Sequence, residues 1–216
     1  MTAAIRAVFW DNDGVLVETE HLYFEANRRV LARAGVALTE DQYIDLFLVQ
    51  GRGAWHLLEE RGVAAAEIDR LRDQRNALYT VLIREAPRAV PGVEDVLSQL
   101  HGRYVMGVVT SSRKDHFAAI HESTGLLPYF DFVLAVGDYA RSKPEPDPYL
   151  RAIEKSGVAP EACIAIEDSE RGLIAATRAG LRCLVIPSAL TRRQAFPGAY
   201  RVLGGVSEIP AALKAG

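Results

Sequence analysis

Four short polar segments of the sequence carry the residue types that phosphoryl chemistry needs. They contain, in chain order, the acids Asp11 and Asp13, the hydroxyls Thr110, Ser111 and Ser112, the lysine Lys143, and the acids Glu167 and Asp168. Several carboxylates brought together require a cation, and a site made only of oxygen ligands favours Mg²⁺. A magnesium ion, a lysine and helix N-terminal amides together suit a phosphoryl group. The residue types therefore predict a phosphate site if the fold brings the four segments together.

The two aspartates of the first segment suit two different roles in the hydrolysis of a phosphate ester, nucleophilic attack and proton transfer. With an ordinary pKa of about 3.9, Asp11 is expected to be ionised at neutral pH and to need no base to act as a nucleophile. Asp13 can protonate the leaving oxygen and then deprotonate the attacking water. The expected cycle forms and hydrolyses an aspartyl-phosphate. The hydroxyls of segment 110–112 would bind phosphate oxygens, and Lys143 would hold the phosphate and the Asp11 carboxylate together.

Five short apolar segments predict the strands that position these residues. They lie at 5–10, 104–109, 132–136, 163–166 and 183–186. Their hydrophobicity is nearly continuous, which is typical of parallel strands covered on both faces. Helical patterns alternate with the last four strands, at 113–123, 146–156 and 170–179. This alternation predicts an α/β fold with a doubly wound, Rossmann-like parallel sheet of five core strands.

The polar segments follow the carboxyl ends of four of these strands, where open α/β sheets bind ligands. If the second and third strands extend to one side of the first, right-handed crossovers place the fourth and fifth on its other side. Asp11 then becomes a neighbour of Glu167 and Asp168. Helix capping or turn chemistry explains any one polar segment alone. It does not explain four such segments along one edge of a sheet.

The first interval between strands is much longer than a crossover requires. Roughly ninety residues separate Asp11 from Tyr104, whereas a parallel crossover needs about a dozen or more. A helix near 93–101 can serve as the crossover. The rest shows several amphipathic helical patterns and no strand pattern. We therefore expect a catalytic core formed by 1–18 and 87–216, and an inserted α-helical cap formed by 19–86.

The segments DNDGVLVETE, VVTSS, SKPEPDPYL and IEDSERGLIAA resemble the four motifs of the haloacid dehalogenase-like hydrolase superfamily. More narrowly, they resemble its branch of phosphoglycolate phosphatases and β-phosphoglucomutases, which carry a helical cap after the first motif. The resemblance implies that Asp11 is the nucleophile and Asp13 the acid and base. It also implies that Mg²⁺ is bound by Asp11, the Asp13 carbonyl and Glu167 or Asp168. A true dehalogenase has no use for Asp13.

By this resemblance, the protein is expected to be a magnesium-dependent phosphatase acting on a sugar phosphate or a phosphoglycolate-like ester. A β-phosphoglucomutase-like phosphomutase is the alternative, but such enzymes carry Gly-x-Ser-Arg where the cap loop 51–54 reads Gly-Arg-Gly-Ala. A non-enzymatic receiver-like module also holds an aspartyl-phosphate, yet its acceptor lies on a later strand and it lacks a large insertion. Within the cap, Arg52 and Arg75 are the candidates for binding substrate or a second phosphate. Trp55 and His56 are further possible contacts.

Composition and charge argue against other classes of partner. The 216 residues carry a formal net charge of −3, which gives no electrostatic footprint for nucleic acid or an anionic membrane surface. No apolar segment approaches the roughly 20 residues of a membrane span. The early acids interrupt the apolar core that a signal peptide needs. We expect a soluble cytoplasmic protein, a monomer, whose partner is a small phosphorylated metabolite.

Overall fold

The computed structural model describes residues 3–85 and 88–214. The chain divides into two compact units, one formed by Met1–Glu18 and Pro87–Gly216 and the other by Thr19–Ala86. The predicted boundary between residues 86 and 87 falls outside the described residues. Each unit has its own secondary structure and its own buried residues.

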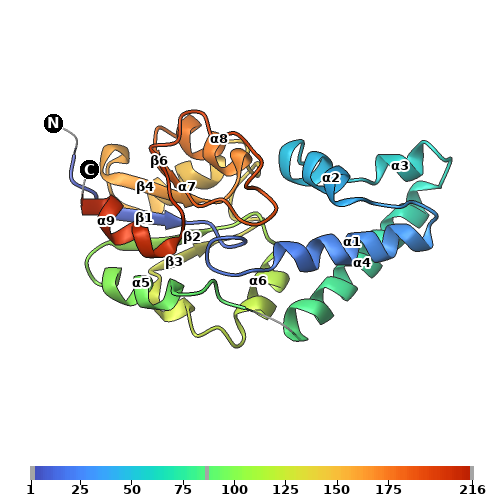
Figure 1. The fold of residues 1–216 in the computed structure, drawn as a ribbon, viewed down its shortest axis with the longest axis horizontal. Coiled ribbons are helices and arrows are strands. Elements are labelled where there is room, and N and C mark those ends of the chain that lie inside the picture. The colour runs from blue at the N-terminus through green and yellow to red at the C-terminus, as the bar shows by residue number, and fades with distance from the viewer. Residues whose placement is uncertain (1–2, 86–87, 215–216) are drawn as a thin grey trace. The chain divides into compact units, whose positions relative to one another are not determined.

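The larger unit is built on a six-stranded sheet with the strand order β3-β2-β1-β4-β5-β6 (Figure 1). The strands are β1 (Ala7–Trp10), β2 (Val105–Val109), β3 (Phe132–Leu134), β4 (Cys163–Glu167), β5 (Arg182–Val185) and β6 (Arg201–Val202). Every neighbouring pair is parallel. The predicted doubly wound α/β fold is confirmed, with the second and third strands on one side of the first and the fourth and fifth on the other.

The sixth strand was not predicted. Both of its residues are exposed, and it pairs with β5 through Leu184↔Arg201 and Val185↔Val202. Main-chain hydrogen bonds fix this edge: the Leu203 N–H, for example, donates to the Val185 carbonyl at 2.8 Å. An exposed two-residue strand buries no apolar face, so hydrophobic periodicity cannot detect it.

Helices cover both faces of the sheet. They are α5 (Val93–Leu100), α6 (Lys114–His121), α7 (Asp147–Ser156), α8 (Glu170–Arg178) and α9 (Ile209–Lys214), with short 3₁₀ segments at Leu127–Tyr129, Pro160–Ala162 and Val206–Glu208. Helices α7 and α8 pack together on one face, and α5 and α9 on the other (Figure 1). The Ser169 hydroxyl caps α8 by accepting the Gly172 N–H at 3.2 Å. This cap fixes the first turn of α8 directly after the acids that end β4.

The smaller unit is helical. It contains α1 (Glu20–Arg33), α2 (Glu40–Tyr43), a π-helical segment at Ile44–Val49, α3 (His56–Glu59) and α4 (Ala65–Glu85), and no strand among its described residues. Helices α1 and α4 pack together, and each carries a fully buried apolar residue, Val30 on α1 and Ile83 on α4. Across the described residues of the whole chain, no helix combines the length and apolar character that crossing a membrane requires.

Candidate active site

The parallel register of the larger unit brings the predicted polar segments to one edge of the sheet. Asp11 directly follows β1, and its N–H donates to the Ile166 carbonyl of β4 at 2.9 Å. Thr110 directly follows β2, and its N–H donates to the Leu134 carbonyl of β3, also at 2.9 Å. Because β1 lies between β2 and β4, the first acids become neighbours of both the hydroxyl segment and the acids that end β4.

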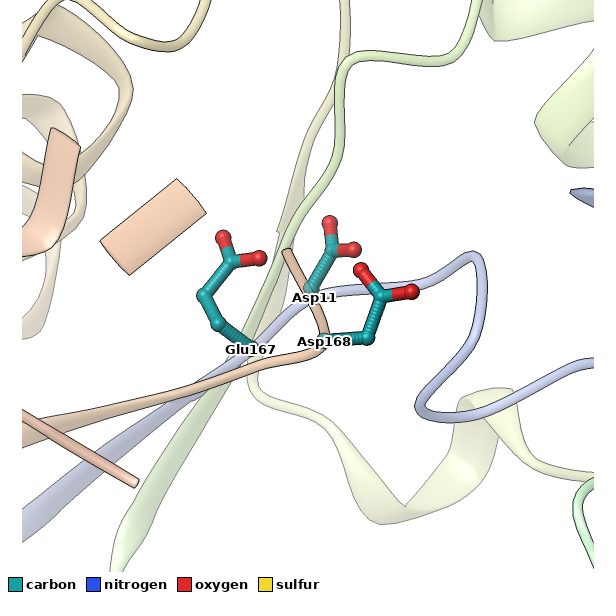
Figure 2. Close-up of side chains that lie close together, drawn as sticks. All are labelled: Asp11, Glu167 and Asp168. Carbon is teal, nitrogen blue, oxygen red and sulfur yellow. The ribbon is translucent and has the colours of Figure 1, made fainter. Parts of the chain in front are cut away.

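Three buried carboxylates meet at this edge. One oxygen from each of Asp11, Glu167 and Asp168 lies within 4.8 Å of the others. Figure 2 shows the three side chains projecting side by side from the ends of β1 and β4. Glu167 is fully buried, and the other two are less than a tenth exposed. Buried carboxylates this close repel one another unless positive charge compensates them. The donor set is all oxygen and therefore fits a hard divalent cation such as Mg²⁺.

Lys143 supplies part of that positive charge. Its Nζ lies 2.7 Å from Asp11 Oδ1 and 2.6 Å from Glu167 Oε1, and it donates to the Val109 carbonyl at 2.8 Å. The lysine is itself buried. One ammonium compensates at most one of the three carboxylates, so the site retains negative charge that a divalent cation would balance.

These surroundings shift two pKa values. Burial, followed by repulsion from Glu167, raises the pKa of Asp11 from 3.8 to about 8, although Lys143 opposes the shift. The prediction that Asp11 has an ordinary pKa and is ionised at neutral pH is therefore wrong for the protein without a cation. Burial also disfavours the charge of Lys143, but the attraction of Asp11 and Glu167 outweighs burial and holds the pKa of the lysine above its ordinary value.

Asp13 lies beside this cluster and is held through one oxygen. Its Oδ2 accepts hydrogen bonds from Ser112 Oγ at 2.8 Å, Asn12 Nδ2 at 3.3 Å and Thr110 Oγ1 at 3.5 Å. Ser112, predicted to contact phosphate, thus donates to the acid here. Ser111 is exposed.

Gly14 lets the first acidic segment approach the last. It has a φ of 83°, a backbone conformation that favours glycine. A Cβ at this position would lie 2.3 Å from Asp168 Oδ2. A side chain here would therefore collide with an acid of the cluster.

Several residues that support the site were not predicted from the sequence. The Tyr149 hydroxyl donates to Glu167 Oε1, and the Tyr139 hydroxyl donates to the Thr110 carbonyl at 2.6 Å. An Arg171 guanidinium N–H donates to the Lys143 carbonyl. Tyr149 is fully buried on α7, so its sequence pattern is that of an ordinary core aromatic. Only the three-dimensional packing reveals its polar partner.

In the helical unit, Arg75 is buried rather than exposed on the surface of α4. Its Nη1 donates to the Tyr23 hydroxyl and to Asn27 Oδ1, the latter at 2.9 Å. The guanidinium carbon lies 4.6 Å from the ring centroid of Tyr23 and 5.5 Å from that of Trp55. Within the described residues, these partners and Asn76 are neutral, and no carboxylate forms an ion pair with Arg75.

Of the other candidates of the helical unit, Trp55 packs against Arg75, whereas no contact of Arg52 or His56 with Arg75 is found among the described residues. Arg52 is exposed in the loop between the π-helical segment and α3. His56 is half-buried at the start of α3. The sequence did not distinguish Arg52 from Arg75 as candidates. In the structure, Arg52 is an exposed loop residue and Arg75 is a buried residue of α4.

Comparison with known proteins identifies the family. Residues 5–180 match the family model of haloacid dehalogenase-like hydrolases, a span that contains all four motifs. The chain belongs to this family. The resemblance predicted from the sequence is confirmed.

Among haloacid dehalogenase-like hydrolases, the chain is 34% identical to Protein CbbY of Cereibacter sphaeroides over 220 residues, covering 95% of this chain and 94% of that one. It is 32% identical over 182 residues to the phosphorylated carbohydrates phosphatase of Thermotoga maritima, covering 82% of each. The crystal structure of CbbY from Rhodobacter sphaeroides in complex with phosphate superposes with a TM-score of 0.83 at 29% identity, covering 97% of this chain and 99% of that one.

Proposed function

We propose that this protein is a magnesium-dependent phosphatase that hydrolyses a small phosphate monoester, a sugar phosphate or phosphoglycolate-like compound, through an aspartyl-phosphate on Asp11. The observation that carries the proposal is the buried cluster of Asp11, Glu167 and Asp168, with Lys143 2.7 Å from Asp11 Oδ1. A relative named for its activity on phosphorylated carbohydrates supports this substrate class.

The cation would be held by the carboxylates of Asp11 and of Glu167 or Asp168, together with the backbone carbonyl of Asp13. When bound, Mg²⁺ supplies positive charge that offsets the repulsion between a carboxylate nucleophile and a phosphate dianion. It also stabilises the ionised form of Asp11, whose pKa burial raises to about 8. Glu167 also binds Lys143 and Tyr149, and Asp168 accepts from Thr191 Oγ1 at 3.5 Å, so both acids remain candidate ligands.

In the first half-reaction, a carboxylate oxygen of Asp11 attacks phosphorus and the ester P–O bond breaks. Asp13 gives a proton to the departing alkoxide oxygen. In the second, Asp13 takes a proton from water, the water oxygen attacks phosphorus, and cleavage of the acyl phosphate returns Asp11 and inorganic phosphate. Lys143 orients Asp11 and offsets charge, Thr110 and Ser111 bind phosphate oxygens, and Ser112 holds Asp13 through its 2.8 Å hydrogen bond.

For the helical unit, residues 19–86, we propose a part in substrate selection. Arg75 is buried among neutral partners, and a buried guanidinium is stabilised by an anion or by hydroxyl oxygens that accept its N–H groups. We therefore assign Arg75 the leading role in binding a second anionic or hydroxylated group of the substrate. Arg52, flanked by glycines in an exposed loop, is the second candidate.

The proposal is tested by measuring inorganic phosphate released from a panel of sugar phosphates, phosphoglycolate and p-nitrophenyl phosphate. We expect release with Mg²⁺ and none with EDTA. Analysis of the sugar products separates the alternatives, because a phosphomutase would form an isomeric sugar phosphate and a bisphosphorylated intermediate. Absence of phosphate release across the panel with Mg²⁺, or release unaffected by EDTA, would overturn the proposal.

A further inference from the structure

His121 is buried at the end of α6 and directly contacts the first acidic segment. Its Nε2 lies 2.8 Å from Asn12 Oδ1, and its Nδ1 lies 2.7 Å from Thr124 Oγ1. Its exposed fraction is 7% and that of Asn12 is 0%. Asn12 stands between the two aspartates of the segment, so the histidine contacts the acid loop from the side of the protein core.

The hydrogen-bonding groups fix the direction of each bond. The carbonyl oxygen of the Asn12 side chain can only accept, so Nε2 of His121 carries the proton and donates. Nδ1 then accepts from the Thr124 hydroxyl, which in turn accepts the Leu126 N–H at 3.4 Å. Burial lowers the pKa of His121 to about 4, consistent with a neutral ring at pH 7.

We propose that His121 is a positioning residue for Asp13, acting through the carboxamide of Asn12. With Oδ1 directed to the histidine, the Asn12 amide nitrogen faces Asp13 and donates to its Oδ2 at 3.3 Å. Without a donor at position 121, the Asn12 oxygen loses its partner, so the carboxamide is no longer held with its N–H directed to Asp13. The inference rests on the proposed role of Asp13 as acid and base.

The expected consequence is a loss of proton transfer rather than of substrate binding. A misplaced Asp13 weakens protonation of the leaving oxygen, a step that general acid–base catalysis typically accelerates by about 10²–10⁴-fold. Because His121 acts indirectly, we expect kcat on an alkyl phosphate to fall by roughly tenfold with little change in KM. A p-nitrophenolate leaving group needs no proton, so its rate of aspartyl-phosphate formation, measured in a single turnover, should fall by less than about twofold.

The experiment compares His121→Phe, which keeps a buried ring but removes the donor, with His121→Gln, whose side-chain amide can donate to Asn12. Both are assayed with Mg²⁺ on glucose 6-phosphate and p-nitrophenyl phosphate. His116→Phe removes another buried histidine of α6 and controls for general destabilisation, which thermal melting monitors. We expect His121→Phe to lose activity on the alkyl phosphate but not on p-nitrophenyl phosphate. His121→Gln should recover most of that activity, and His116→Phe should keep wild-type activity on both esters.

Equal losses on both esters in the rate of aspartyl-phosphate formation, or no recovery by His121→Gln, would overturn the inference. A second readout does not depend on turnover: crystal structures of wild type and His121→Phe show whether the side chains of Asn12 and Asp13 keep their positions and their 3.3 Å contact. An unchanged Asn12 and Asp13 in the variant would refute the positioning role. If wild type releases phosphate from no ester of the panel above, the proposed function fails, and the crystallographic comparison still decides whether His121 holds Asn12 in place.

Discussion

Binding of Mg²⁺ should release a proton from Asp11 near neutral pH. Burial and the neighbouring Glu167 raise the pKa of this carboxyl to about 8, and metal ligands bind in their deprotonated form. With that pKa, about a tenth of Asp11 is ionised at pH 7 and about half at pH 8. Each ion bound should therefore displace most of a proton at pH 7, and less as pH rises through about 8.

The apparent dissociation constant should follow the same titration. It should fall about tenfold between pH 6 and pH 7 and level off above about pH 8.5. Calorimetric titrations in two buffers with different protonation enthalpies measure both the affinity and the protons released. Asp11→Asn should bind Mg²⁺ more weakly and without this proton. Asp115→Asn is the control and should match wild type. Hydrogen bonds from Arg113 are the main cause that lowers the pKa of Asp115 to about 2, so this carboxyl is ionised at every pH tested and has no proton to release.

The pH dependence of stability in the protein without Mg²⁺ gives an independent check that the pKa of Asp11 is raised. The pKa of Asp11 is higher in the folded chain than its ordinary 3.8, so folding favours the protonated form. The resulting stabilisation is complete below about pH 4 and is lost as pH rises through about 8. Asp11→Asn should remove this part of the pH dependence of Tm, and Mg²⁺ should restore stability at pH 8. A Mg²⁺ affinity that stays constant from pH 6 to pH 9, without proton release, would refute the reasoning.

Three further predictions concern the elements around the cluster. Gly172→Ala places a methyl group 1.8 Å from Glu167 Oε2. Measured by chemical denaturation, this variant should have a free energy of unfolding about 1–3 kcal/mol lower than wild type. Gly205→Ala is the control, because a methyl group there meets open space, and it should not lower the free energy of unfolding. Arg75→Met should reduce kcat/KM on the preferred sugar phosphate by about 10–100-fold and have little effect on p-nitrophenyl phosphate; equal losses on both would contradict a substrate contact. Asp13→Asn should retain Mg²⁺ binding in calorimetry while losing about 10²–10⁴-fold in kcat on alkyl phosphates, and turnover close to wild type would exclude the acid role.

The sheet and the meeting of the acids could be predicted because both follow from local patterns and one rule of handedness. Apolar segments such as CIAI read as buried strands, and right-handed crossovers then determine the strand order. Once β4 lies beside β1, Glu167 must lie near Asp11. No contact between distant side chains has to be known for this inference.

Features that depend on side-chain packing could not be predicted. The exposed strand β6 has no hydrophobic signal and forms by pairing with β5. Arg75 looks like a surface residue in the sequence, yet it lies between aromatic rings contributed by other segments of the helical unit. The raised pKa of Asp11 requires knowing that Glu167 is a buried neighbour. The contact between His121 and Asn12 joins residues 109 positions apart, and His121 lies on a helix rather than in one of the strand-end segments.

The central claim, that Asp11 is the nucleophile, is tested most directly by trapping the phosphorylated enzyme. Protein mixed with substrate and Mg²⁺ is quenched in acid within the first turnover, digested, and analysed by mass spectrometry. We expect one phosphoryl group on the peptide that contains Asp11, lost on treatment with hydroxylamine as acyl phosphates are, and absent from Asp11→Asn. Phosphate release from wild type without any labelled Asp11 peptide, or turnover by Asp11→Asn within tenfold of wild type, would contradict the account.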